Sequence, residues 1–194
     1  MNVVKEGTLV WSGEHWINYL RRSGAGQDSG MISLYYTRWS AAGEGTAAFV
    51  DIPGDKGFPT LYTDNREVAE LVLETMIRGR GTHFDRDLPV VDARITRGGD
   101  IRINPAWTVR ASGQEIVSTW QVTEPPVIMY GPAPSGAERI EVFSVLYFTY
   151  EASITVDGRA VSGKPYTRDI WRSSIGGDRS SSVFALAETI IRVG

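Results

Sequence analysis

Apolar and polar residues alternate most regularly between positions 139 and 156. The even-numbered positions are apolar except for Ser144, and the odd-numbered positions at both ends of the segment are polar. A period of two is typical of a β-strand with one buried face. Fully extended, this segment would span roughly 60 Å, far more than an ordinary strand. We therefore expect it to coil around a barrel rather than to run straight.

Shorter stretches of the same kind predict further strands. They cover residues 7–11, 31–39, 46–52, 90–97, 107–111, 115–123, 166–172 and 182–193. The dipeptides Ser112-Gly113 and Asp157-Gly158 are typical hairpin turns between such strands. Consecutive hairpins favour an antiparallel up-and-down barrel. The fold class is therefore mainly β, in a single domain over residues 1–194.

One segment has the period of a helix instead. Asp64 and Glu67 resemble the start of a capping box, a wide apolar face follows, and Gly79 ends the pattern. One or two short helices are predicted, the second over residues 14–22. Residues 124–136 contain four prolines and are predicted to be a loop, whose apolar Ile128, Met129 and Tyr130 could form a lid.

Composition and charge exclude several classes of function. With 42% apolar and 22% charged residues the chain is an ordinary globular sequence, and its formal net charge is −3. It lacks the basic patch of a nucleic-acid-binding protein and the polybasic run of a membrane-surface protein. It has no cysteine and no apolar stretch of signal-peptide or membrane-spanning length. We expect a cytoplasmic protein without nucleic-acid or membrane partners, and a homodimer is compatible with the sequence.

Aromatic residues give the broadest functional signal. The chain has six Trp, eight Tyr and six Phe, and large aromatic residues both fill cores and line pockets. Inward positions of a small barrel either fill it or leave room for one small ligand. A plain aromatic core is the alternative interpretation. The candidate ligand-binding residues are Trp107, Trp120, Ser144, Phe148, Tyr150 and Trp171.

The two histidines and their acidic neighbours are the candidates for catalysis. In an extended segment His83, Asp85 and Asp87 would point the same way, as acid–base groups or ligands of a hard divalent ion. The alternative is a solvated connector, which we prefer, so no metal or cofactor is expected. His15 follows Glu14 and is either an acid–base group or a partly buried, hydrogen-bonded histidine near the rim, the alternative that we prefer. The catalytic candidates are thus His83, Asp85, His15 and Glu14.

The arrangement resembles the lipocalin-like (calycin) barrels. The resemblance lies in the first strand, Gly7-Thr8-Leu9-Val10-Trp11, the helix and the hairpins between residues 107 and 193. It is architectural, and the chain departs from the family in the residues before Trp11 and in its mid-chain helix. The resemblance implies that a small hydrophobic or aromatic molecule binds in the barrel interior. It also implies an alternative, a cofactor-independent lyase, isomerase or cyclase acting there on an isoprenoid- or polyketide-like substrate.

Overall fold

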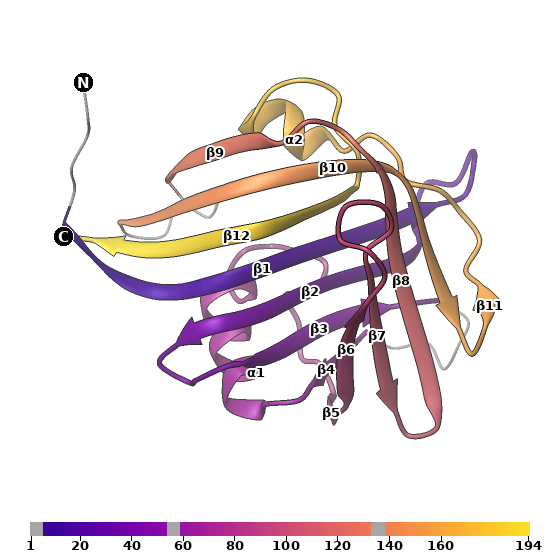
Figure 1. Ribbon diagram of the computed structural model, residues 1–194, viewed down its shortest axis with the longest axis horizontal. Helices are drawn as coiled ribbons and strands as arrows, with labels where there is room; N and C mark the ends of the chain where they lie inside the picture. The colour runs from indigo at the N-terminus through magenta and orange to yellow at the C-terminus, as the bar shows by residue number, and fades with distance from the viewer. Residues whose placement is uncertain (1–5, 54–58, 133–138) are drawn as a thin grey trace.

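The computed structural model describes residues 6–53, 59–132 and 139–194, and its strands form one sheet. The strands are β1 (Gly7–Arg21), β2 (Asp28–Ser40), β3 (Gly45–Asp51), β4 (Thr60–Thr63), β5 (Val90–Asp92), β6 (Arg94–Gly98), β7 (Ala106–Ala111), β8 (Gln114–Thr123), β9 (Val127–Pro132), β10 (Ile140–Val156), β11 (Arg159–Ala160) and β12 (Ser182–Val193). Their order is β5-β4-β3-β2-β1-β12-β10-β8-β7-β6, with β9 and β11 paired to β10. The terminal strands of this order, β5 and β6, are separated in sequence by Ala93 alone. The sheet curls into a nearly closed barrel (Figure 1).

The mainly β fold predicted from the sequence is confirmed, but the sheet is mixed. Strands β4 and β5 run parallel, with Leu61 opposite Val90, because the helical segment between them carries the chain back to the same end. The first and last strands, β1 and β12, are neighbours in the middle of the sheet. The topology therefore differs from a simple succession of hairpins.

Strand β10 coils as the sequence predicted. Its first half pairs with β12, with a bulge between Ser144 and Leu146, and its second half pairs with β8. Because the strand coils, side chains on the same row of β10 point to different cores at its two ends. Leu146 and Phe148 point to one core and Ile154 to another.

Strands β1 to β3 bury both of their faces. In β1, Trp16 and Leu20 point to one side, whereas Ile17 and Tyr19 point to the other. On the first side β6–β8 cross over the long strands (Figure 1), and the buried side chains form what we call the barrel core. The barrel core consists of Trp16, Leu20, Ile32, Leu34, Ala48, Val50, Ile95, Trp107, Val109, Ile116, Trp120, Ile154, Val156 and Phe184.

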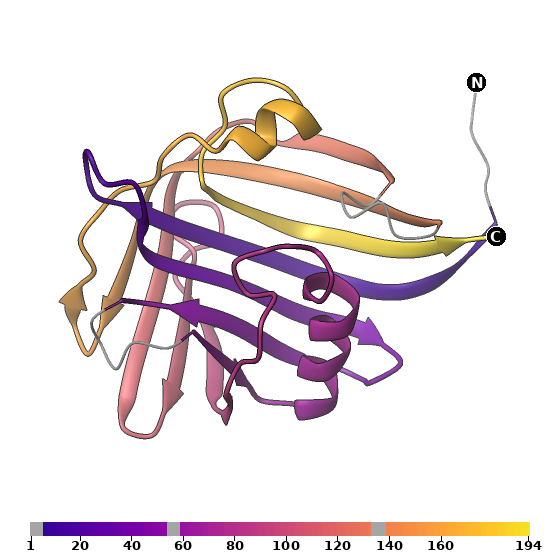
Figure 2. The ribbon, with the colours of Figure 1, turned by 180° about the vertical axis from the view of Figure 1, so that it is seen from behind.

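The opposite face carries the helices and the second core, here the helix-side core. Helix α1 (Arg66–Val72) continues into the π-helical turn η1 (Leu73–Ile77), and both pack on β1–β3 (Figure 2). The helix-side core includes Trp11, Ile17, Tyr19, Tyr35, Phe49, Leu61, Val72, Leu73, Phe84, Leu146, Phe148, Val183 and Ile190. A second helix, α2 (Asp169–Ser174), lies over the first half of β10 (Figure 2). No helix in the described ranges is both long and apolar enough to cross a bilayer.

The predicted helix start is wrong by one residue. Asn65, not Asp64, caps α1, because its side-chain oxygen accepts from the backbone N–H groups of Glu67 and Val68. Asp64 instead accepts from the N–H of Thr46 at 2.6 Å and so ties the helix to β3. Gly79 follows the helix with a φ of 71°, which favours glycine, so the predicted end is confirmed.

Four predicted segments differ from the structure. Residues 90–97 are divided at Ala93 into β5, which pairs with β4, and β6, which pairs with β7. Residues 14–22 form most of β1 rather than a helix, because a strand buried on both faces shows no simple alternation. Residues 166–172 form a single bridge at Thr167 and the start of α2 instead of a strand. In the predicted loop, residues 127–132 are β9, paired with β10, so Ile128, Met129 and Tyr130 are strand residues rather than a lid. Residues 133–136 of that loop lie outside the described ranges.

Candidate functional site

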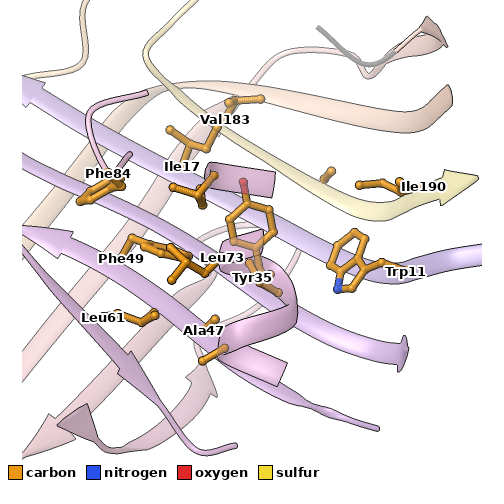
Figure 3. Close-up of a cluster of buried hydrophobic side chains, with 14 of the residues drawn as sticks. Trp11, Ile17, Tyr35, Ala47, Phe49, Leu61, Leu73, Phe84, Val183 and Ile190 are labelled. Carbon is orange, nitrogen blue, oxygen red and sulfur yellow. The ribbon is translucent and has the colours of Figure 1, made fainter. Parts of the chain in front are cut away.

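A cavity of about 490 Å³ lies on the helix side of the sheet. Its walls come from β1, β2, β10 and β12, from η1 and the turn after it, and from α2. The lining side chains include Ile17, Tyr19, Met31, Ser33, Tyr35, Met76, Ile77, Arg80, His83, Phe84, Leu146, Arg168, Trp171, Val183, Glu188 and Ile190, together with His15. Four of these lining residues, Ile17, Tyr35, Phe84 and Val183, come from separate segments and are labelled in Figure 3. This volume is typical of sites for small organic molecules.

His15 is the centre of a polar cluster in the cavity. Its Nε2 lies 3.0 Å from the hydroxyl of Ser33, and its Nδ1 lies 3.5 Å from Oε1 of Glu188. The imidazole stacks on Tyr35, with ring centroids 4.0 Å apart. The buried Glu188 accepts a hydrogen bond from Ser144 at 2.9 Å. Glu188 thus favours the tautomer with the proton on Nδ1, and Nε2 is then a basic nitrogen that accepts from Ser33.

Two tyrosines adjoin this cluster as neutral hydrogen-bonding groups. Burial raises the pKa of Tyr35, and the charge of Glu188 raises it further. Burial also raises the pKa of Tyr19, while the guanidinium of Arg168 opposes that shift. Both hydroxyls are therefore protonated at neutral pH, and each lies within hydrogen-bonding reach of the Ser33 hydroxyl.

The second histidine lies at the rim. Nε2 of His83 is 2.6 Å from Oδ2 of Asp51, and about a third of the His83 side chain is exposed. Asp85 does not join it, because its carboxylate accepts from the backbone N–H groups of Gly79 and Gly81, which lowers its pKa. The segment is a turn and not the extended stretch that would align His83, Asp85 and Asp87. In the part of the chain that the structure describes, no three His, Asp or Glu side chains are placed to hold a metal ion.

Glu14 lies on the other face of β1, because successive residues of a strand point to opposite sides. Its fully buried carboxylate accepts from Nε1 of Trp16 at 3.0 Å and forms ion pairs with Arg38 and Arg97. It is therefore a neutralised structural group of the barrel core and does not act on His15. The partners of the two histidines are Glu188 and Asp51 instead.

The six candidate ligand-binding residues do not come together at one site. Trp171 lines the cavity, and Phe148 packs edge-on against it with centroids 5.3 Å apart. Ser144 reaches the site only through Glu188. Trp107 and Trp120 belong to the barrel core, on the opposite face.

Tyr150 does not reach the cavity either. It is 45% exposed and donates to Glu124 at 2.8 Å, because the coil of β10 turns this position outward.

Sequence reasoning missed Ser33, Tyr35 and Glu188. A signal existed for Glu188, since it is a carboxylate in an otherwise apolar row with Phe184, Leu186 and Ile190. Its approach to His15 depends on β1 pairing with β12, which the local pattern does not contain.

Comparison of the chain with models of known protein families and with curated proteins found no match. The nearly closed, mostly stranded barrel is compatible with a lipocalin-like fold.

Proposed function

We propose that the protein binds a small, largely apolar molecule in the helix-side cavity. The observation that carries the proposal is a volume of about 490 Å³ with mostly apolar walls and a polar cluster around His15. Ligand sites commonly combine an apolar lining with a few convergent polar groups that orient the guest. The hydroxyls of Ser33, Tyr19 and Tyr35 would supply that orientation.

The proposed site differs from the one expected from the sequence. In the barrel core Trp16 stacks on Phe184 at 4.4 Å and contacts Trp120 edge-on at 5.1 Å. Such close aromatic packing supports a structural role for Trp107 and Trp120. The proposal keeps the ligand class implied by the lipocalin-like resemblance and places the ligand on the opposite face of the long strands.

Tryptophan fluorescence tests the proposal with the neutral probe N-phenyl-1-naphthylamine. We expect the probe to quench tryptophan emission through Trp171, and the W171F variant to lose most of that quenching. Trp39 is 49% exposed and outside the cavity, so W39F is the matched control and should respond like the wild type. The proposal fails if the probe does not bind and no compound of a diverse hydrophobic library stabilises the protein thermally.

The pair of His15 and Glu188 favours a second candidate function. A histidine held by a buried carboxylate at the edge of an apolar cavity can act as a general base. With Nε2 as the base and the tyrosine hydroxyls donating to a developing oxyanion, the site would suit a cofactor-independent isomerase, lyase or cyclase. The substrates would be carbonyl compounds of isoprenoid- or polyketide-like character.

Hydrogen exchange in D₂O tests this second candidate. A bound carbonyl compound should incorporate deuterium next to its carbonyl, and H15Q should abolish the exchange while N-phenyl-1-naphthylamine still binds. E188Q should slow the exchange by about 10- to 100-fold, as expected for loss of the group that orients a general base. Equal exchange rates in H15Q and the wild type would overturn the assignment.

A further inference from the structure

We infer that the ligand is an organic acid, whose negatively charged group pairs with Arg168 at the α2 end of the cavity, with Arg80 as a second cation of the lining. This inference rests on the proposed function and specifies the chemistry of the guest. The apolar body would lie against Ile17 and Val183, and the acid group would lie near Trp171.

Arg168 is held in place by aromatic rings and not by a carboxylate. Its guanidinium carbon lies 4.7 Å from the ring centroid of Tyr19 and 6.0 Å from that of Trp171. Cation–π contacts of this kind are made with the ring face and do not by themselves satisfy the guanidinium N–H donors. Among the described residues no carboxylate forms an ion pair with Arg168.

Neighbouring arginines make the contrast clear. Arg172 pairs with Asp169 and Asp178, and Arg179 pairs with Glu124. Carboxylates are thus common around α2, yet none of those described forms an ion pair with Arg168, the arginine near α2 that lines the cavity. A partly buried guanidinium without a counter-ion favours an anionic partner from outside the chain.

Arg80 adds a second positive charge to the same lining. One of its nitrogens, Nη2, donates to the carbonyl of Thr75 at 2.6 Å, and in the described part of the chain it forms no ion pair with an acid. Glu188 is the sole carboxylate among the described residues of the lining, and His15 and Ser144 hold it. The cavity therefore has more positive than negative charge at neutral pH.

Trp171 supplies an independent observation at the same place. Its Nε1 is buried and has no hydrogen-bond partner within the described ranges, although its ring lines the cavity. Buried donors in folded proteins are nearly always satisfied. Because this N–H has almost no accessible surface, it would donate to an acid group beside Arg168 only after a shift of the indole.

Two probes of similar size test the inference, because they differ by one sulfonate. They are 8-anilinonaphthalene-1-sulfonate and the neutral N-phenyl-1-naphthylamine. We expect the anionic probe to bind at least about tenfold more tightly at low salt, as for a charge-assisted hydrogen bond. R168Q should remove most of that difference and change binding of the neutral probe by less than about twofold.

Three controls keep the result specific. R80Q should reduce the preference for the anion by a smaller factor, because Arg80 already donates to Thr75. R168K keeps the charge but loses the planar fork, so it should be intermediate. R172Q changes an exposed, paired arginine of α2 and should bind both probes as the wild type does.

The outcomes separate this inference from the proposed function. If both probes bind with equal affinity, or if R168Q weakens both equally, the inference is overturned and the apolar site remains. If neither probe binds, the proposed function fails and the inference fails with it. A preference for dodecanoate over dodecanol in displacing the neutral probe would extend the result from sulfonates to carboxylic acids.

Discussion

The two faces of β1–β3 bury similar side chains but are covered differently. The barrel core is closed by β6–β8, strands of the same sheet whose spacing is fixed by the hydrogen-bonded ladder, and its aromatic rings are in contact. The helix-side core is closed by α1, η1, a turn and α2, which are held mainly by side chains. The cavity therefore lies beneath the elements that are not hydrogen-bonded into the sheet.

The two faces also treat a buried carboxylate differently. On the barrel side the carboxylate of Glu14 forms ion pairs with two arginines and accepts a hydrogen bond from the indole of Trp16. On the helix side Glu188 faces a histidine and a serine hydroxyl at the edge of the cavity. A fully paired charge stabilises a fold, whereas a carboxylate beside a titratable ring can take part in chemistry.

Removal of a barrel-core indole should give the largest effect. Trp120 is fully buried and donates to the carbonyl of Ile17 at 2.8 Å. W120A should lower the free energy of unfolding by about 3–5 kcal/mol, measured by urea denaturation. W171A should cost less than half as much, because Trp171 is only partly buried beside an open volume. Equal losses in the two variants would contradict the difference between the cores.

A phenylalanine introduced into each core tests the difference in packing between the two cores. Val109 lies in the barrel core and Val183 lines the cavity, and both are almost completely buried. V109F should destabilise the protein by about 1–3 kcal/mol through overpacking and leave binding of N-phenyl-1-naphthylamine intact. V183F should cost less than about 1 kcal/mol and abolish binding. The opposite pattern of stability and binding would place the open volume in the barrel core.

The sequence pattern located several individual strands, but it did not show which strands pair with one another. Alternation located β10 to within one residue, because one face of its ends meets solvent. It failed for residues 14–22, where both faces of β1 are buried and the pattern resembles a helix. The acids beside the two candidate histidines are Glu188 and Asp51, which the local pattern does not indicate because they come from strands that only the fold brings close.

Loss of the α1 cap should loosen the helix side selectively. N65A removes the acceptor for the N–H groups of Glu67 and Val68 and should cost about 1 kcal/mol. Amide hydrogen exchange should accelerate in α1 and η1 more than in β7 and β8. Uniform acceleration across both regions would show that the two covers open as one unit.

The smallest expected effect is a pH dependence on the helix side. Burial and the hydrogen bond to Asp28 raise the pKa of Tyr166 from 10.0 to about 12. The folded protein then holds this proton more tightly than the unfolded chain does. The resulting stability is complete below pH 10 and is lost as the pH rises to 12.

The contribution of Tyr166 should be roughly 0.5–1 kcal/mol, allowing for solvent screening at a half-exposed site. Urea denaturation of the wild type and Y166F between pH 9 and pH 12 measures it. The stability difference between the two proteins should shrink across this interval, and a constant difference would contradict the assignment.

A crystal of the protein soaked with 1-bromo-2-naphthoic acid tests the central claim most directly. Anomalous scattering would locate the bromine. We predict bromine density in the cavity between β12 and η1, with the carboxylate near Arg168. Density among Trp16, Trp107 and Trp120 would contradict the account, as would a cavity left empty at a concentration that saturates tryptophan quenching in solution.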